Sequence, residues 1–391
     1  MGLTPLRKAY DVGSDPAIGS AFHRAMADLR GTAPVIEIQM WGQPAFLLTR
    51  YETVRSAFVD NDRIPAGRSY ELSTRPVIGS TFINLDGPAH DQQRRLATPA
   101  FRSRAVERFD SDRLRRLVHE VVDRFAERSS AELVTELTTV FPYLAISRKL
   151  GLPAADEERL RKWAIGLLGY NFNPGAAREA ALQFTSFLQP VIEQRRDSPT
   201  DDVLSGLLHS SVDGAQFTDE QVISHVRLLF AVGATTTVHA IGNMLSTVLR
   251  RPELWARLRD DPDVRPGVVA ESLRFEPPLG ALPRFVPERV EIDGYDLPAG
   301  SFAVLGIAAA NHDPALVAQP EVFDPDREHH DIVTFGFGPH FCPGSHLARN
   351  EMAAVLDVLA ERLPGIRLAS QEGSAPRSAI LRAPTALPVT W

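Results

Sequence analysis

One stretch near the middle of the chain has the marks of a single long, buried helix. It opens with Thr218-Asp-Glu-Gln221, a capping box in which the Thr hydroxyl and the Gln side chain satisfy backbone donors reciprocally. It runs to Arg250–Arg251, and Pro252 ends it. Some thirty residues at ~1.5 Å each span roughly 50 Å, long enough to cross a whole domain. Residues 228–249 carry no formal charge and are largely apolar, so we expect this helix to be buried.

The flanking regions indicate a mainly helical protein with a small β portion. Apolar residues recur with the period of an amphipathic helix from Arg113 to Phe125. Proline and glycine punctuate residues 277–343, which contain short strand-like pieces at Arg289–Tyr295 and Phe302–Ile307. No linker rich in Gly and Ser divides the chain and no repeat is present, so we predict one domain over residues 1–391.

The composition disfavours three classes of protein: nucleic-acid binders, disulfide-rich secreted proteins and membrane-anchored proteins. A net charge of −7 disfavours a general nucleic-acid binder. One cysteine in 391 residues argues against a disulfide-stapled secreted protein and suits a reducing cytoplasm. Residues 1–30 contain no long apolar run, so we expect neither a signal peptide nor a membrane anchor.

The single cysteine, Cys342, lies in a glycine-rich run from Phe335 to Arg349. One thiol cannot supply an iron–sulfur cluster or an all-thiolate zinc site, but it can act as a nucleophile, fill core space or serve as the axial ligand of a heme. A helix is predicted from Ser345 to Leu363, and its positive end stabilises a thiolate placed just before it.

This run closely resembles the heme-binding loop of the cytochrome P450 family. The matching positions are Phe335, Gly336, Gly338, His340, Cys342, Gly344, Ala348 and Arg349. Three distant motifs agree with the resemblance: Glu271-Ser-Leu-Arg274, Arg327 in Phe323-Asp-Pro-Asp-Arg327, and His90-Asp-Gln-Gln-Arg94. The resemblance extends from about Asp86 to Trp391, and the N-terminal region is compatible with it.

The resemblance implies a single-domain cytochrome P450 fold, with heme b between the long helix and the helix after the cysteine. It makes Cys342 the thiolate ligand of the iron, and Phe335 and Gly344 part of the cofactor-binding loop. The expected partners of the heme propionates are His90, Arg94, Arg284 and His340. An ion network of Glu271, Arg274 and Arg327 is also expected, and the alternative for Glu271 and Arg274 is a surface pair of little energetic worth.

The long helix carries a segment, Ala231 to Thr237, that resembles the oxygen-binding segment of the family. Gly233 matches the glycine that admits dioxygen, Thr236 matches the alcohol, and a helix distortion is expected there. The usual acid is missing, because Thr235 occupies its place. Cleavage of the O–O bond needs protons, so we expect a hydroxyl–water chain, helped by His239, to replace the acid. Alternatively, Thr235 bonds back to a helix carbonyl and only shapes the site.

A second departure from the family pattern is Pro343, directly after the expected ligand. Proline has no N–H, so one backbone donor that could bond to the sulfur is absent. The thiolate should therefore keep more electron density, which lowers the potential of the iron.

The electrons must come from separate proteins. Gly336-x-Gly338 is not a dinucleotide fingerprint, since Phe341 takes the place of the third glycine. The resemblance therefore implies a ferredoxin or flavodoxin with an NAD(P)H-dependent reductase. A basic stretch on the side of the heme sulfur is interpreted as the surface on which this redox partner docks. The alternative is an ordinary solvated helix surface. The members of the basic stretch are Arg94, Arg95, Arg102, Arg104, Arg108, Arg113, Arg115 and Arg116.

The resemblance predicts a monooxygenase that inserts one oxygen atom of O2 into a lipophilic organic substrate, by hydroxylation or epoxidation. The expected pocket residues are mainly apolar: Leu228, Ala231, Val232, Leu279, Leu282 and Ile380. Arg68, Tyr70 or Arg75 could anchor an acidic group, although loop arginines are more often solvated. Two other classes stay open: a heme enzyme driven by peroxide, and a non-catalytic heme sensor or electron carrier. The pair His329-His330 could attract a metal, but an exposed loop is the simpler interpretation.

Overall fold

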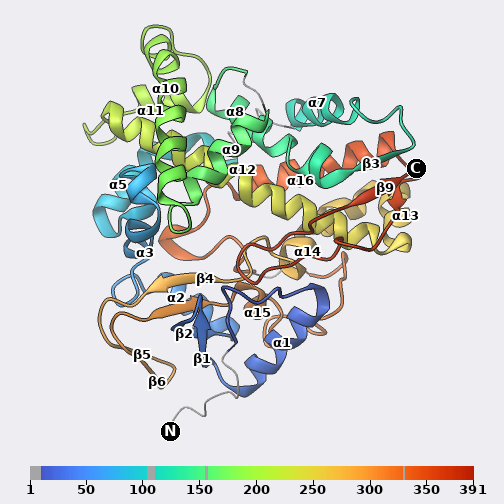
Figure 1. Cartoon of the computed structure of the whole chain (residues 1–391), viewed down its shortest axis with the longest axis horizontal. Helices are drawn as coiled ribbons and strands as arrows, with labels where there is room; N and C mark the ends of the chain where they lie inside the picture. Colours follow the sequence, from blue (N-terminus) through green and yellow to red (C-terminus); the bar gives the residue numbers. More distant parts are fainter. Residues whose placement is uncertain (1–9, 104–110, 155–156, 329–330) are drawn as a thin grey trace.

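The computed structural model describes residues 10–103, 111–154, 157–328 and 331–391. Helices fill the upper part of the molecule in Figure 1, and a smaller region of strands and short helices lies below them. The N-terminus lies at the lower edge, and the C-terminus lies beside strands β3 (Ser130–Glu132) and β9 (Pro388–Thr390). The predicted fold class, mainly α with a small β portion, is confirmed.

The long helix is α12 (Asp219–Leu249), and it crosses the helical part as predicted. The capping box is formed: Gln221 N donates to Thr218 Oγ1 at 3.3 Å, and Thr218 N donates to Gln221 Oε1 at 2.9 Å. Although α12 is long and apolar enough to cross a membrane, 72% of its most apolar window is buried inside the protein. Most of this window therefore packs against other parts of the protein.

Other helices surround α12 and bury it. Those that pack directly against it include α8 (Phe141–Leu150), α9 (Glu157–Leu168), α10 (Pro174–Asp197), α14 (Arg265–Phe275) and α16 (Ser345–Arg362). Helix α7 (Ser111–Val122) packs on α16. It ends three residues before the predicted Phe125, because Arg124 N and Phe125 N bond to carbonyls three residues back and turn the chain out of the helix.

The β portion is built from short strands. Its largest sheet has the order β1-β2-β7-β4, in which β2 pairs in parallel with β7 so that Ala45 lies opposite Phe302 and Leu48 opposite Leu305. A second sheet has the order β3-β9-β8. The bounds are β1 (Val35–Met40), β2 (Gln43–Leu48), β4 (Leu282–Phe285), β7 (Phe302–Leu305) and β8 (Arg367–Leu368).

The strand predicted over Arg289–Tyr295 is instead a hairpin of β5 (Val290–Ile292) and β6 (Tyr295–Leu297). Asp293 and Gly294 form its turn, with φ of 50° and 79°. Positive φ at both central residues suits the twist of a two-residue hairpin, and an Asp-Gly pair adopts it readily.

The remaining helices position the loops around the site. Their bounds are α1 (Gly19–Thr32), α2 (Tyr51–Val59), α3 (Ala66–Ser73), α4 (Arg75–Ile78), α5 (Gly87–Ala97), α11 (Val203–His209), α13 (Pro252–Asp260) and α15 (Ile307–Asn311). In Figure 1, α3 and α5 lie at the left of the helical part, above the hairpin β5–β6.

Candidate active site

The cysteine loop is shaped by glycine. Gly336 and Gly338 have φ of 72° and 74°, a left-handed conformation that other residues rarely adopt. A Cβ on Gly338 would also stand 2.7 Å from Cγ1 of Val59. The loop closes through Cys342 N, which donates to the carbonyl of Phe335 at 2.8 Å. This places the thiol just before α16.

The environment of the Cys342 thiol balances burial against positive charge. Burial raises its pKa, whereas the backbone N–H of Gly344 and the guanidinium groups of Arg94 and Arg349 lower it. Arg94 reaches the loop from α5 and donates to the carbonyl of Phe341, and Arg349 lies over the ring of Phe335 at 4.5 Å. The net pKa of the thiol lies above its ordinary value, so the two cations from different helices offset only part of the effect of burial. The thiolate is the form that binds a metal.

Two histidines meet beside this loop. The rings of His90 and His340 lie 4.2 Å apart, and His340 Nε2 is 2.9 Å from Asp86 Oδ1. His90 Nδ1 lies 3.0 Å from Asp91 Oδ1, while its Nε2 is buried without a hydrogen-bond partner. Burial lowers the pKa of His90, and the nearby His340 lowers it further. A buried, unpartnered ring nitrogen is a group that calls for a ligand.

Arg284 lies in the same region, but its guanidinium is directed to the end of α2. Its Nη1 donates to the carbonyls of Ala57 and Ile64 at 3.0 and 3.2 Å, and its Nη2 to that of Phe58 at 3.3 Å. Its Nε is buried without a partner. The Nη groups of Arg284 are thus engaged by the chain around α2, and its Nε, like Nε2 of His90, is left for an anion.

These residues fit an iron porphyrin with carboxylate side arms. The thiol of Cys342 would offer a ligand to the iron, and the unpartnered Nε2 of His90 would offer a hydrogen bond to an anion. Arg94 lies close to the thiol, and the ring of His340 lies close to that of His90. Among the described residues, no cluster of three or more His, Cys, Asp or Glu side chains offers a separate metal site, and His329-His330 lie outside them.

The threonines of α12 differ in their hydrogen bonds. Thr236 Oγ1 donates to the carbonyl of Val232 at 2.9 Å, and Thr237 Oγ1 donates to that of Gly233 at 3.0 Å. Thr235 Oγ1 is buried without such a partner. The alternative in which Thr235 bonds back to the helix is therefore not what the structure shows. The expected distortion does not interrupt α12, which is one continuous helix through this segment.

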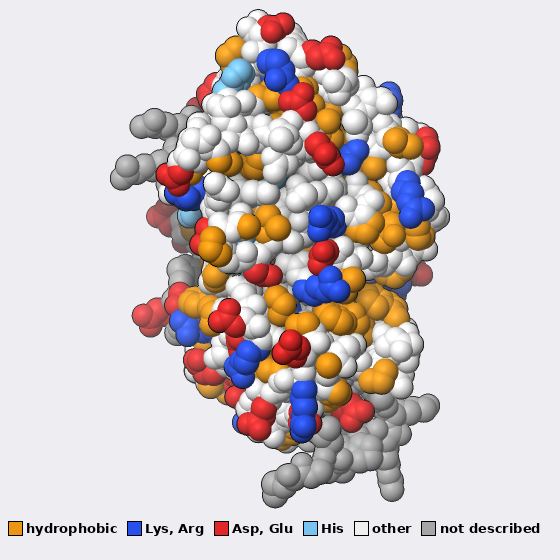
Figure 2. All heavy atoms as spheres, turned by 90° about the vertical axis from the view of Figure 1, so that its left-hand side faces the viewer, with side chains coloured by type: hydrophobic (Ala, Val, Ile, Leu, Met, Phe, Trp, Pro, Cys, Tyr) orange, Lys and Arg blue, Asp and Glu red, His pale blue; other side chains and the backbone are white. Residues whose placement is uncertain are grey.

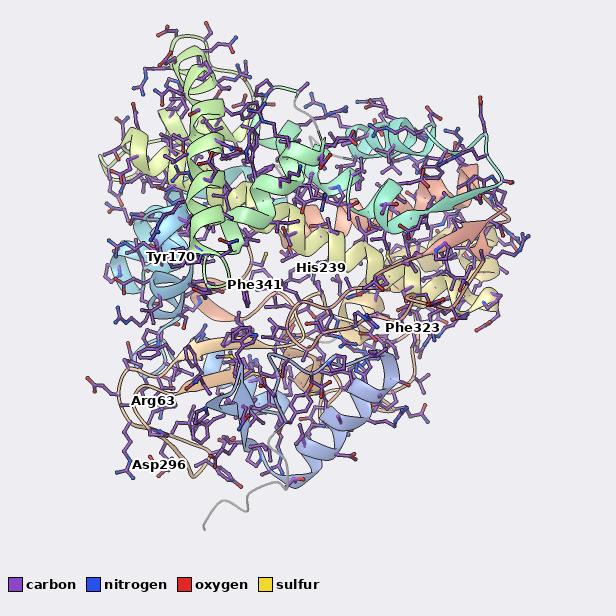
Figure 3. The ribbon with its side chains drawn as sticks, viewed as in Figure 1. Arg63, Tyr170, His239, Asp296, Phe323 and Phe341 are labelled. Atoms are coloured by element: carbon purple, nitrogen blue, oxygen red, sulfur yellow. The ribbon has the colours of Figure 1, made fainter. Side chains whose placement is uncertain are left out.

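His239 follows Thr235 by one turn of α12. Burial lowers the pKa of His239 to about 4, and its Nδ1 has no hydrogen-bond partner. Its ring is therefore neutral near pH 7. Figure 3 labels His239 together with Phe341 of the cysteine loop in the middle of the molecule, between the helical part and the β portion.

Gly233 faces α8. A Cβ at this position would stand 3.1 Å from Cδ1 of Ile146, which is tighter than ordinary packing. The glycine thus lets two helices approach closely, whatever its role toward oxygen.

The Glu-x-x-Arg motif of α14 forms a buried network. Arg274 donates from Nε to Glu271 Oε2 at 2.8 Å and from Nη2 to Oε1 at 2.7 Å. Arg327 Nε adds a hydrogen bond to Glu271 Oε1 at 3.2 Å. The side chains of Arg274 and Glu271 are only 2% and 4% exposed, so the pair is not a solvated surface contact.

The sequence analysis missed a second buried network. Glu276 accepts from Arg382 at 3.2 Å and lies 2.8 Å from Nε2 of His23. The ring of His23 stacks on His312 at 4.4 Å. No spacing in the sequence signals this cluster, because its members are separated by tens to hundreds of residues.

The expected pocket residues come from α12 and from two loop segments that the fold brings together. Leu228 and Ala231 are fully buried on α12, and Val232, Leu279, Leu282 and Ile380 are partly buried. Gly280 N donates to the carbonyl of Ile380 at 2.8 Å, which joins the two loop segments. Arg68 and Arg75 pair with Glu71 in solvent, at 2.6 and 3.0 Å, as solvated loop arginines do.

A hollow of about 840 Å³ opens between α5 and the cysteine loop. Arg94, Arg95 and Arg102 line it, together with Cys342 and Pro343. Figure 2 shows the face of the molecule that carries α3 and α5, where basic and acidic side chains are interspersed. Several arginines of the basic stretch are paired, such as Arg95 with Asp213 at 2.7 Å and Arg115 with Asp357 at 2.9 Å. Arg104 and Arg108 lie outside the described residues.

Comparisons with known proteins show the family of this chain. The sequence model of the family described as "Cytochrome P450" matches residues 10–147 and 174–363. The chain is 34% identical over 375 residues to mycinamicin IV hydroxylase/epoxidase of Micromonospora griseorubida, covering 93% of this chain and 94% of the relative. It is 32% identical over 399 residues to nocardicin C N-oxygenase of Nocardia uniformis subsp. tsuyamanensis, covering 98% of both. The solved structure of a cytochrome P450 from Chondromyces apiculatus superimposes with a TM-score of 0.86 at 31% identity, over 94% of each chain.

Proposed function

Because this chain belongs to the cytochrome P450 family and is a P450 monooxygenase, we propose that it inserts one atom of O2 into a lipophilic organic substrate by hydroxylation or epoxidation. The family implies a heme-thiolate cofactor, and we propose heme b. The observation that supports the proposal most directly is the Cys342 thiol, held before α16 with Arg94 and Arg349 beside it. When bound, the heme supplies a thiolate-ligated iron that activates dioxygen.

The residues of the chain then have distinct tasks. Cys342 ligates the iron through its thiolate. His90, Arg94 and His340 bind the propionates, and Arg284 contributes its unpartnered Nε while its Nη groups serve α2. Phe335 and Gly344 shape the loop around the sulfur. Glu271, Arg274 and Arg327 hold α14 to the segment before the loop.

At the oxygen-binding segment of α12, the chain would hold oxygen and deliver protons. We assign Gly233 to the space beside the oxygen and Thr236 to a hydrogen bond with water or the oxygen itself. Thr235 enters the relay through its unpartnered hydroxyl. Because His239 is neutral, it takes part as a hydrogen-bond partner and carries no stored proton.

Bacterial members of the family generally receive electrons from redox partners. For this chain we propose a ferredoxin or flavodoxin with an NAD(P)H-dependent reductase, docking at the hollow lined by Arg94, Arg95 and Arg102. That hollow reaches Cys342 and Pro343, so a partner bound there lies close to the sulfur. We place the protein in the cytoplasm and treat residues 1–391 as one domain.

The substrate is proposed only as a class. Leu228, Ala231, Val232, Leu279, Leu282 and Ile380 offer an apolar surface that selects a ligand by shape. Two relatives of similar identity act on different molecules, mycinamicin IV and nocardicin C, so the identity to either one does not fix the substrate.

The test begins with the heme-loaded protein reduced under CO. The wild type should show the spectrum of thiolate ligation, and Cys342→Ser should lose it. Lipophilic compounds are then screened by the spin-state shift of the heme. Product that forms with NAD(P)H, surrogate redox proteins and O2 supports the proposal. Product that forms with peroxide alone would identify a peroxygenase, and a wild-type spectrum without thiolate ligation would overturn the assignment of Cys342.

A further inference from the structure

Tyr143 lies where α8 crosses the oxygen-binding segment of α12. Its side chain is buried, and its ring lies 6.4 Å from that of Phe230 on α12. One turn further along α8, Ile146 packs against Gly233. The phenol is therefore carried by a helix that is fixed closely against residues 230–235.

The hydroxyl of Thr235 has the phenol of Tyr143 as a polar neighbour. Burial raises the pKa of Tyr143, whereas its interaction with the Thr235 side chain and the charge of Arg161 lower it. Thr235 Oγ1 still lacks a partner with full hydrogen-bond geometry, so a small movement or one water can complete the link. Arg161, on α9, is partly exposed.

We propose that Tyr143 is a positioning residue of the proton relay, which holds the hydroxyl of Thr235 and connects it toward the partly exposed region of Arg161. This inference rests on the proposed monooxygenase function. The phenol of Tyr143 would supply a proton-passing group from α8. The α12 segment lacks such a group, because Thr235 stands in the place of an acid.

The proton balance is simple. The phenol passes its proton to Thr235 as it receives another from the solvent side, and Thr235 passes its own proton onward to a water near Thr236. No group gains or loses charge over the cycle. Because burial makes the phenol a weak acid, it conducts protons and does not store them.

The other polar side chains of this part of α12 are less suited to pass a proton to Thr235. Thr236 and Thr237 donate their hydroxyl hydrogens to carbonyls of α12. His239 is on the same helix as Thr235, but its low pKa leaves it unprotonated near neutral pH. Tyr143 approaches Thr235 from outside α12, on the neighbouring helix α8.

The first test is spectroscopic and needs no turnover. The heme-loaded protein is labelled with 13Cζ-tyrosine and studied by NMR in its diamagnetic ferrous–CO state, and the signal of Tyr143 is assigned through its loss in Tyr143→Phe. Thr235→Val should shift this signal, and the matched variant Thr237→Val should not. An unmoved signal in Thr235→Val overturns the contact.

The second test measures coupling, which is the product formed per NAD(P)H consumed. It also measures the solvent isotope effect on product formation. Tyr143→Phe should keep the ferrous–CO spectrum and the substrate spin-state shift, but lose coupling by about three- to tenfold, with an altered isotope effect. Tyr295→Phe, on β6, should couple like the wild type. Adding Thr235→Asp to Tyr143→Phe should restore most of the coupling, because the acid no longer needs the phenol.

The outcomes separate the two proposals. If the wild type shows no thiolate spectrum or no O2-dependent product, the proposed function fails. If the wild type turns over and Tyr143→Phe keeps its coupling and isotope effect, the role of Tyr143 fails alone. Loss of coupling that Thr235→Asp does not rescue indicates a structural role and also overturns the inference.

Discussion

Arg274 donates two parallel hydrogen bonds to the carboxylate of Glu271, at 2.8 and 2.7 Å, with both side chains almost completely buried. A buried pair of this kind adds little net stability over an apolar pair of the same volume, but removal of one partner leaves an uncompensated charge. Two further N–H groups of Arg274 donate to the carbonyls of Asn311 and Val322, so the pair also fixes the chain between α15 and the cysteine loop.

Glu271→Gln should therefore destabilise the protein strongly. We expect a loss of about 3–5 kcal/mol in the free energy of unfolding, since the guanidinium of Arg274 stays buried without a counter-charge. Chemical denaturation of the heme-loaded protein measures the loss. The matched control is Glu71→Gln in the exposed pair with Arg68, which should change stability by no more than about 0.5 kcal/mol. Equal losses in the two variants would contradict the prediction.

Thr236→Ala should uncouple electron use from product formation. The hydroxyl of Thr236 is held toward its helix by the carbonyl of Val232 and is available to accept from a water. Its loss should lower the product formed per NAD(P)H by about tenfold and release the balance as peroxide or water. Thr237→Ala removes a hydroxyl with the same kind of back-bond and serves as the control. Full coupling in Thr236→Ala would exclude a relay through this residue.

The sequence predicted the parts of the molecule that local spacing encodes. The capping box at Thr218 and the proline at 252 mark the ends of α12, and the glycines at 336 and 338 mark the turn of the cysteine loop. What local spacing cannot encode is contact between distant segments. Tertiary packing brings together Glu276, His23 and Arg382, and it places Tyr143 beside Thr235. No periodicity in the sequence predicts either contact.

Pro343→Leu should raise the reduction potential of the heme iron. The sulfur of Cys342 accepts from the backbone N–H of Gly344, and a residue other than proline at 343 would add a second donor nearby. One further hydrogen bond that favours the reduced state by about 1 kcal/mol corresponds to roughly 40 mV. A spectroelectrochemical titration measures the shift. Pro343→Ala should match Pro343→Leu if the amide is responsible, and an unchanged potential in both would show that this position does not bond to the sulfur.

Electron transfer from the redox partner should slow as salt is added. Arg102 lines the hollow beside Cys342, where a docked acidic partner would meet it. Arg102→Gln should lower the rate constant of association by about two- to tenfold at low salt and flatten its salt dependence. Arg289→Gln, just before β5, is the control because Arg289 does not line the hollow and its guanidinium pairs with Asp296. Equal effects of the two variants would show that the hollow is not the docking face.

The network around Glu276 should make stability depend on acid pH. Despite burial, which alone raises its pKa, His23 and Arg382 hold the pKa of Glu276 at about 2, against an ordinary value of 4.5. A depressed folded-state pKa gives stability that is complete above the unfolded pKa and is lost as pH falls toward the folded one. Between pH 6 and pH 3 the wild type should lose about 2 kcal/mol through this group.

Glu276→Gln tests this dependence directly. The variant is less stable at pH 6, because Arg382 loses its counter-charge, but its stability should fall less on acidification. The difference between wild type and variant should thus shrink by about 2 kcal/mol between pH 6 and pH 3 in denaturant unfolding at equal heme content. Glu372→Gln, at an exposed position, should follow the wild-type profile. A constant difference over this range would show that Glu276 titrates in the folded protein as it does in the unfolded chain.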